Sequence, residues 1–174
     1  MGMNTSYDRL TKYFHWGLAI LIVAEYVFVW LIPEGTRGPN ALASYHMSFG
    51  IVILALIFAR IVWRGRVHTP PHPEGMPSWQ IKASLWTHGL LYALLVVLPL
   101  SGWLWVSANG WHVTLFGVVD LPPLLAKQPA LGAFFSGTHE FLASAVLALV
   151  ALHTLAALYH WLIVKDNLMQ NMWP

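Results

Sequence analysis

Four long runs of apolar residues dominate the chain. They extend from Phe14 to Ile32, from Tyr45 to Trp63, from Leu85 to Ser107 and from Phe141 to Val164. About 20 residues of helix, at a rise of about 1.5 Å per residue, cross the hydrocarbon core of a bilayer. Each run is close to that length, and more polar segments separate the runs. The pattern therefore predicts an all-α integral membrane protein, a four-helix bundle, in which residues 1–174 form a single domain.

The basic residues predict how these helices are oriented. Seven of the nine lysines and arginines flank the same ends of the four runs: Arg9, Lys12, Arg60, Arg64, Arg66, Lys82 and Lys165. Only Arg37 and Lys127 lie in the other two loops. Because basic residues accumulate on the cytoplasmic side of membrane proteins, we expect a multi-pass protein with both termini in the cytoplasm.

Composition narrows the class of protein further. Hydrophobic residues make up 57% of the chain and charged residues only 9%, whereas soluble domains carry roughly 25% charged residues. The expected partner is therefore the lipid bilayer, and nothing in the sequence indicates a nucleic-acid partner. Cysteine is absent, which excludes disulfides, thiolate-bound iron–sulfur clusters and covalent haem attachment through a Cys-x-x-Cys-His run.

Two segments carry a structural expectation of their own. Residues 108–138 are too long for a simple turn and too interrupted for a membrane span, so we expect a short interfacial helix around Pro123 to Phe135. Pro99 lies inside the third apolar run. Membrane helices tolerate such a proline because neighbouring groups satisfy the freed carbonyl, and a kink is expected there.

Histidines recur in the apolar runs, where ionisable residues are rare and by default indicate function. His139 and His153 are 14 residues apart, which corresponds to about 21 Å along a helix axis and to azimuths within about 40°. His15 begins the first run at the depth of His153, and His46 begins the second at the depth of His139. A lone histidine in a span is often only a hydrogen-bonding residue between helices, so the matched depths carry the functional interpretation.

Two imidazoles that face each other across a helix bundle suit the axial positions of haem iron, whereas zinc favours three or four ligands around a small volume. We therefore expect two non-covalently bound haems, with His15 and His153 on the cytoplasmic side and His46 and His139 on the outer side. Glu25, near the middle of the first run, has no evident partner. Two alternatives stay open: purely structural histidines, and a metal-ion transporter whose histidines form a path.

Further candidates lie near the cytoplasmic ends of the runs. Arg60 is 14 residues after His46, and its planar guanidinium suits a propionate of the inner haem, although a boundary arginine is the alternative. His88 and His160 have no histidine opposite them at the same depth. They indicate a quinone headgroup site, because imidazole donates hydrogen bonds and shuttles protons; for His160 the alternative is a boundary residue. The remaining three histidines lie in loops and are expected to be ordinary surface residues: His68, His72 and His112.

Several stretches of the chain resemble the bacterial cytochrome b561 family. They are "FHWGL" at 14–18, "YHMSFG" at 45–50, "THGLLYALLVVLPLSGW" at 87–103, "THEFLASAVLALVALH" at 138–153 and "VKDNLMQNMWP" at 164–174. The resemblance covers nearly the whole chain. The wider group includes the cytochrome b subunits of nickel–iron hydrogenase and formate dehydrogenase.

The resemblance implies two b-type haems in the bacterial inner membrane, with axial ligands at the four positions already selected by depth. A compact member of the family is an oxidoreductase that passes electrons from periplasmic superoxide through both haems to ubiquinone. The family's quinone site lies at the cytoplasmic end, which implies His160 and also Lys82, His88 and Trp161 here. We therefore expect a respiratory electron carrier that connects a periplasmic reactant to the membrane quinone pool.

The electron donor and the mode of action stay open. The outer segments hold Arg37 and Lys127 against Glu34, Asp120 and Glu140, which is no positive funnel for an anion such as superoxide. A periplasmic redox protein is therefore an alternative donor. Whether the chain is an enzyme by itself or the membrane-anchoring cytochrome b subunit of a larger dehydrogenase or hydrogenase is likewise open.

Overall fold

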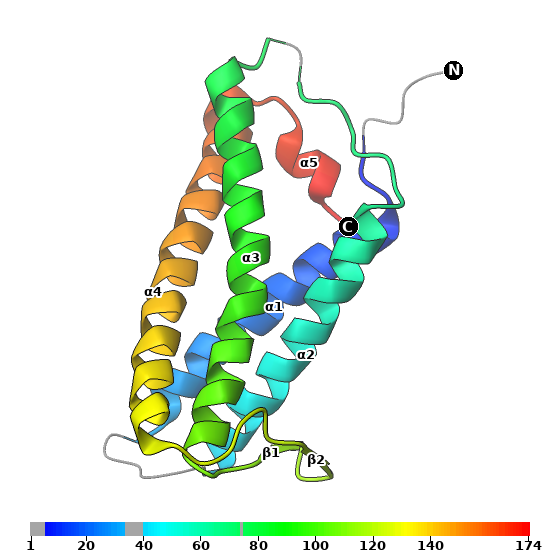
Figure 1. Cartoon of the computed structure of the whole chain (residues 1–174). Coiled ribbons are helices and arrows are strands. Elements are labelled where there is room, and N and C mark those ends of the chain that lie inside the picture. The colour runs from blue at the N-terminus through cyan, green and yellow to red at the C-terminus, as the bar shows by residue number, and fades with distance from the viewer. Residues whose placement is uncertain (1–5, 34–39, 74) are drawn as a thin grey trace.

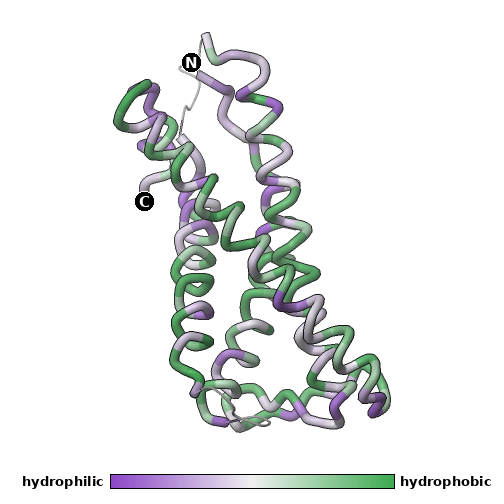
Figure 2. Tube along the Cα trace, turned by 90° about the vertical axis from the view of Figure 1, so that its left-hand side faces the viewer, coloured by the Kyte–Doolittle hydropathy of each residue, from purple (hydrophilic) through white to green (hydrophobic). Residues whose placement is uncertain are grey.

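The computed structural model describes residues 6–33, 40–73 and 75–174; Glu34 and Arg37 lie outside this range. Four long helices dominate it: α1 (Arg9–Leu31), α2 (Ala41–Arg64), α3 (Ser78–Ala108) and α4 (Pro129–Tyr159). All four are long and apolar enough to cross a membrane, and hydrophobic residues follow most of their length (Figure 2). The predicted four-helix membrane bundle is therefore confirmed.

The helices pack as neighbours around one buried layer. α1 packs along α2, α2 against α3, and α3 along α4 (Figure 1). The Tyr26 hydroxyl donates a 2.7 Å hydrogen bond to the Ala143 carbonyl and so joins α1 to α4. The buried cluster draws on all four helices: Leu18, Ile53, Leu54, Ile57, Leu95 and Val146. Since Val146 stands midway along the sequence between His139 and His153, the core lies near the middle of the bundle.

Polar side chains define where two of the helices begin. The Asp8 carboxylate accepts a 3.0 Å hydrogen bond from the Thr11 amide at the start of α1. The Asn40 side chain accepts one of 2.8 Å from the Ala43 amide at the start of α2. Such caps satisfy amide groups that have no partner within the helix. In α3, Pro99 is accommodated inside the helix, which continues to Ala108.

The connection between α3 and α4 differs from the expectation. The predicted short helix around Pro123 to Phe135 is wrong: residues 122–128 are not helical, and Phe135 already belongs to α4. The connection instead holds a hairpin of β1 (Val113–Leu115) and β2 (Val119–Leu121). The turn residues Phe116 and Gly117 both have left-handed φ, which suits a tight hairpin turn. Adjacent prolines then delay helix formation, and Pro129 starts α4 at the position that proline favours.

The opposite end of the bundle is closed by the C-terminal residues. α4 continues into a π-helical turn (His160–Val164), and the chain then reverses through Lys165 and Asn167, both with left-handed φ. The short α5 (Leu168–Met172) follows. The Trp16 indole N–H donates a 3.0 Å hydrogen bond to the Met172 carbonyl, so this segment packs against the start of α1.

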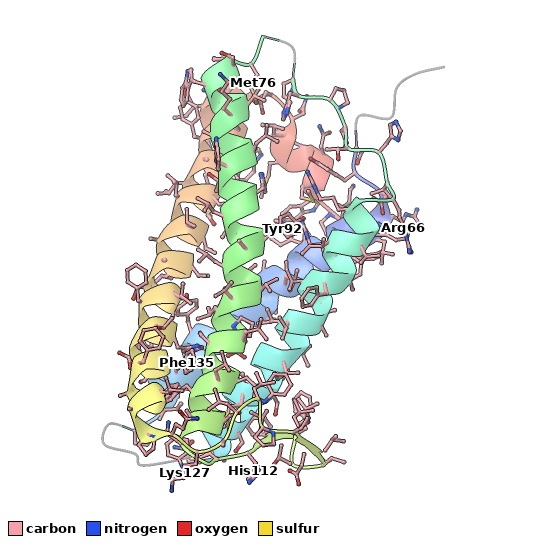
Figure 3. The ribbon with its side chains drawn as sticks, in the orientation of Figure 1. Arg66, Met76, Tyr92, His112, Lys127 and Phe135 are labelled. Carbon is pink, nitrogen blue, oxygen red and sulfur yellow. The ribbon has the colours of Figure 1, made fainter. Side chains whose placement is uncertain are left out.

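The two ends of the bundle therefore have different covers. The hairpin end carries β1 and β2, whereas the terminal end carries the start of α1, the connection between α2 and α3, and α5 (Figure 1). In Figure 3, His112 and Lys127 lie at the hairpin end, and Arg66 and Met76 at the terminal end.

Candidate functional site

A cavity of about 410 Å³ lies in the hairpin-end half of the bundle, within the usual range of about 300–1,000 Å³ for ligand sites. His46 of α2 and His139 of α4 line it, and their ring centroids are 6.0 Å apart. The rest of the lining is mainly aliphatic and aromatic, with Gly50, Gly102, Trp103, Trp105 and Val146 among the residues. A Cβ at Gly50 would meet no atom within 4 Å, so the cavity reaches the backbone of α2.

The orientation of His139 is fixed by α3. Its Nδ1 lies 3.0 Å from the Leu98 carbonyl oxygen and 3.1 Å from the Ser101 hydroxyl. Because a carbonyl can only accept, Nδ1 carries the proton and Nε2 keeps its lone pair. Gly102 permits this close approach, since a Cβ there would lie 2.9 Å from His139 Cε1. His139 is thus held in the tautomer that a metal ligand needs.

His46 has a partner that the sequence pattern did not indicate. Its Nδ1 forms an ion-pair contact with Oε2 of Glu25, which reaches the cavity from α1. Glu25 is six residues before the end of α1 at Leu31, and His46 is five residues after the start of α2 at Ala41. Antiparallel neighbours at equal distances from their shared loop lie at equal depth, so the depth argument used for the histidines would also have found this pair.

Three histidines meet in the terminal-end half of the bundle. The ring centroids of His15 and His153 are 6.1 Å apart, and those of His88 and His153 are 5.2 Å apart. The sequence-based expectation that His88 lacks a histidine neighbour is therefore wrong. Its Nδ1 lies 2.7 Å from the Ser84 carbonyl oxygen, so Nδ1 is protonated and Nε2 is free. The predicted pairs His15–His153 and His46–His139 do lie side by side.

Arg60 is a buried cation beside this group. It is only 8% exposed, its Nε donates a 2.9 Å hydrogen bond to the Tyr92 hydroxyl, and its Nη2 lies 3.5 Å from His15 Nδ1. Figure 3 shows Tyr92 in the terminal-end half of α3. Among the described residues, no carboxylate forms an ion pair with Arg60. Since burying a charge without an opposite charge is costly, the arrangement favours an anionic ligand here.

The other predicted quinone residues are spread over the terminal end. His160 Nδ1 contacts Oδ2 of Asp166, within the reversal that precedes α5. Lys82 of α3 and Trp161 of the π-helical turn are exposed. In the part of the chain that the structure describes, no side-chain hydrogen bond, ion pair or ring contact joins these two to His88 or His160. The loop histidines His68, His72 and His112 are exposed, as predicted.

The donor set and the cavity fit a flat macrocycle with a central metal. Imidazoles on facing helices would supply two axial nitrogens, the apolar walls suit a porphyrin, and Arg60 suits a carboxylate substituent. The two histidine groups lie on either side of the buried layer formed by Leu18, Ile57 and their neighbours. A metal centre at each group would therefore place two redox centres one after the other along the bundle.

Comparisons with known proteins agree with this chemistry. The sequence model of a family described as prokaryotic cytochrome b561 matches residues 6–174. Cytochrome b561 homolog 1 of Escherichia coli is 28% identical over 97% of each chain. Cytochrome b561 homolog 2 of the same organism is 30% identical over 95% of this chain and 90% of its own. A probable superoxide oxidase CybB from Yersinia pestis is 27% identical over 99% of this chain and 98% of its own.

Proposed function

Because the chain belongs to the prokaryotic cytochrome b561 family, it is a b-type cytochrome that transfers electrons across a membrane, and we propose that it does so through two haems. The observation that carries the count of two is the occurrence of two histidine pairs at opposite ends of one bundle. The buried layer between them separates the two centres, and about 21 Å of helix joins His139 to His153.

His46 and His139 hold the haem at the hairpin end. Both keep the Nε2 lone pair for a metal because each Nδ1 faces an acceptor, Glu25 in one case and the Leu98 carbonyl in the other. Gly50 and Gly102 leave room beside the backbone. When bound, haem supplies a reversible one-electron couple between ferric and ferrous iron. The residues around it would set its potential and exclude water, and the two imidazoles would supply ligands to the iron.

His15 and His153 hold the haem at the terminal end, and Arg60 binds one of its propionates. A buried guanidinium whose described partners are a tyrosine hydroxyl and an imidazole has unused donors for a carboxylate. In this proposal His15 and His153 would be the ligands of the iron, and His88 is assigned to the neighbouring quinone site.

The terminal end reduces quinone. Ubiquinone takes up two electrons and two protons to become ubiquinol, and His160, His88, Lys82 and Trp161 bind its headgroup. The His160–Asp166 pair suits this chemistry, because an imidazole oriented by a carboxylate can donate a hydrogen bond to a quinone carbonyl and pass on a proton. The seven basic residues near this end support its location on the cytoplasmic face of the bacterial inner membrane.

The hairpin end receives electrons from the periplasm. Superoxide is the proposed donor, supported by the similarity to a probable superoxide oxidase. Two superoxide ions would each lose one electron and become dioxygen, and one ubiquinone would take both electrons and two protons. A periplasmic redox protein is the alternative donor, because the described outer residues Asp120, Glu140 and Lys127 make no positive funnel.

The decisive experiment follows haem reduction in the purified protein by stopped-flow absorbance, with superoxide and ubiquinol added separately. We expect reduction by superoxide, followed by oxidation of both haems when ubiquinone is added. A protein without b-type absorption bands, or with one haem per chain, would contradict the two-haem proposal. Reduction by ubiquinol but not by superoxide would instead favour a protein donor or a partner subunit.

A further inference from the structure

Glu25 is a largely buried carboxyl group on a membrane helix, and its effect on the haem potentials is a separate question from its contact with His46. Its side chain is 13% exposed, and it lines the hairpin-end cavity. Oε2 contacts His46 Nδ1, while Oε1 is buried and has no hydrogen-bond partner among the described residues. Such a group is costly in a bilayer and by default indicates function.

The roles of the two groups in the Glu25–His46 contact follow from the chemistry of the imidazole. A neutral imidazole that gives its Nε2 lone pair to iron keeps its only proton on Nδ1. The group facing Nδ1 must then accept, so an oxygen of the Glu25 side chain is the acceptor. Carboxylate partners of this kind fix ring orientation and increase the donor strength of the ligating nitrogen.

We propose that Glu25 is the positioning residue of the hairpin-end haem: it holds His46 so that Nε2 faces the iron, and it makes this haem the lower-potential member of the pair. This inference rests on the proposed two-haem function. In this proposal Glu25 is ionised, and its negative charge acts through His46 to stabilise the more positive, ferric state.

The other ligands of the two sites provide the contrast. His139 hydrogen-bonds to a neutral carbonyl, that of Leu98. At the terminal end, the buried Arg60 cation lies near His15 and favours the less positive, ferrous state. A carboxylate at one haem and a guanidinium at the other make electron movement from the hairpin end to the terminal end downhill. That direction is the one that carries electrons from a periplasmic donor to quinone.

The test is a potentiometric titration of both haems in Glu25→Gln, with Glu140→Gln as the matched control. Glu140 lines the same cavity, but its carboxylate accepts from the Ser136 hydroxyl at 3.2 Å and not from a histidine. Glu25→Gln should raise the reduction potential of the hairpin-end haem by about 59 mV. This shift corresponds to about a tenfold change in the equilibrium constant of a one-electron reduction. Glu140→Gln should cause a clearly smaller rise. The low-spin electron paramagnetic resonance signal of this haem should shift only in Glu25→Gln.

Two outcomes overturn the inference while the two-haem function stands. One is an unchanged hairpin-end potential in Glu25→Gln, and the other is an equal rise in both variants. If Glu25→Gln loses the hairpin-end haem, Glu25→Asp decides, because aspartate keeps an anionic acceptor on a shorter side chain. Retention of that haem at the lower of the two potentials supports the inference, and loss of that haem in Glu25→Asp as well overturns it. A wild-type protein with fewer than two haems would instead contradict the proposed function itself.

Discussion

Both histidine groups bring together imidazoles from different helices, but the protein holds the two groups in different ways. At the hairpin end, His46 and His139 line the cavity, and each has Nδ1 in contact with an acceptor, which leaves the lone pair on Nε2. At the terminal end, the nearest partner of His15 is Arg60, which can only donate. Acceptors of the protein itself therefore orient the histidines of the hairpin-end site. The terminal-end site instead contains a buried cation, which favours the binding of an anion. The difference indicates that one site is fixed by hydrogen bonds and the other by charge.

Removing one ligand should separate the two sites most strongly. In His139→Leu we expect the hairpin-end haem to be lost and the terminal-end haem to remain, because the two sites share no ligand and the core lies between them. Pyridine haemochrome analysis should fall from about two haems per chain to about one. His15→Leu should remove the other haem, and His112→Leu, an exposed loop histidine, should remove neither. Equal loss of both haems in His139→Leu would contradict the assignment of one ligand per centre.

Neutralising the buried cation should alter only the terminal-end potential. In Arg60→Met we expect the reduction potential of the terminal-end haem to fall by about 59 mV, which is about a tenfold change in the equilibrium constant of reduction. The potential falls because the cation no longer favours the ferrous state. Redox titration with optical detection measures this shift. Arg66→Met, at an exposed position near the end of α2, is the matched control and should cause little change. A comparable fall at the hairpin-end haem would mean that the two sites are not electrostatically distinct.

Crowding His139 should weaken the hydrogen-bonded site. Gly102→Ala puts a methyl group 2.9 Å from His139 Cε1, and such overpacking costs about 1–3 kcal/mol. This exceeds the gain of about 0.5–1 kcal/mol from replacing glycine in a helix. We expect faster haem loss from the hairpin end, which is measured as the rate of haem transfer to apomyoglobin. Gly137→Ala has open space around it and should not accelerate haem loss; equal behaviour of the two variants would show that Gly102 does not position the ring.

The smallest expected effect concerns the helix caps at the two ends. Partial burial raises the pKa of the Asp8 carboxyl, but hydrogen bonds from Thr11 and the Trp63 indole outweigh it and hold that pKa below its usual range. Asp8→Ala should cost about 1 kcal/mol. A lowered folded-state pKa stabilises at neutral pH, so the cost should vanish as the pH falls through that pKa. Asn40→Ala, the α2 cap, should give a pH-independent loss. Thermal unfolding across acidic pH compares them, and a pH-independent Asp8→Ala effect would exclude the ionised cap.

The sequence by itself determined the features that depend on local periodicity. A run of apolar residues long enough to span a bilayer must satisfy its backbone internally, so the four helices follow from composition and length. Helical geometry then puts residues 14 apart on nearly one face, which is why the shared face of His139 and His153, and the depths of His15 and His46, follow from residue spacing alone. The basic residues at one end follow from the same counting.

The tertiary structure decided everything that depends on how the helices are rotated and paired. Helical periodicity does not state which neighbour a face meets, so the position of His88 beside His153 and the carbonyl acceptor of His139 emerged only on packing. The expected helix near Pro123 did not form because two adjacent prolines delay the start of α4 until Pro129, and the hairpin lies before them. The depth of a residue along a helix follows directly from its position in the sequence. Which residues of two helices touch depends on how the helices are rotated, and the sum of all packing interactions determines that rotation.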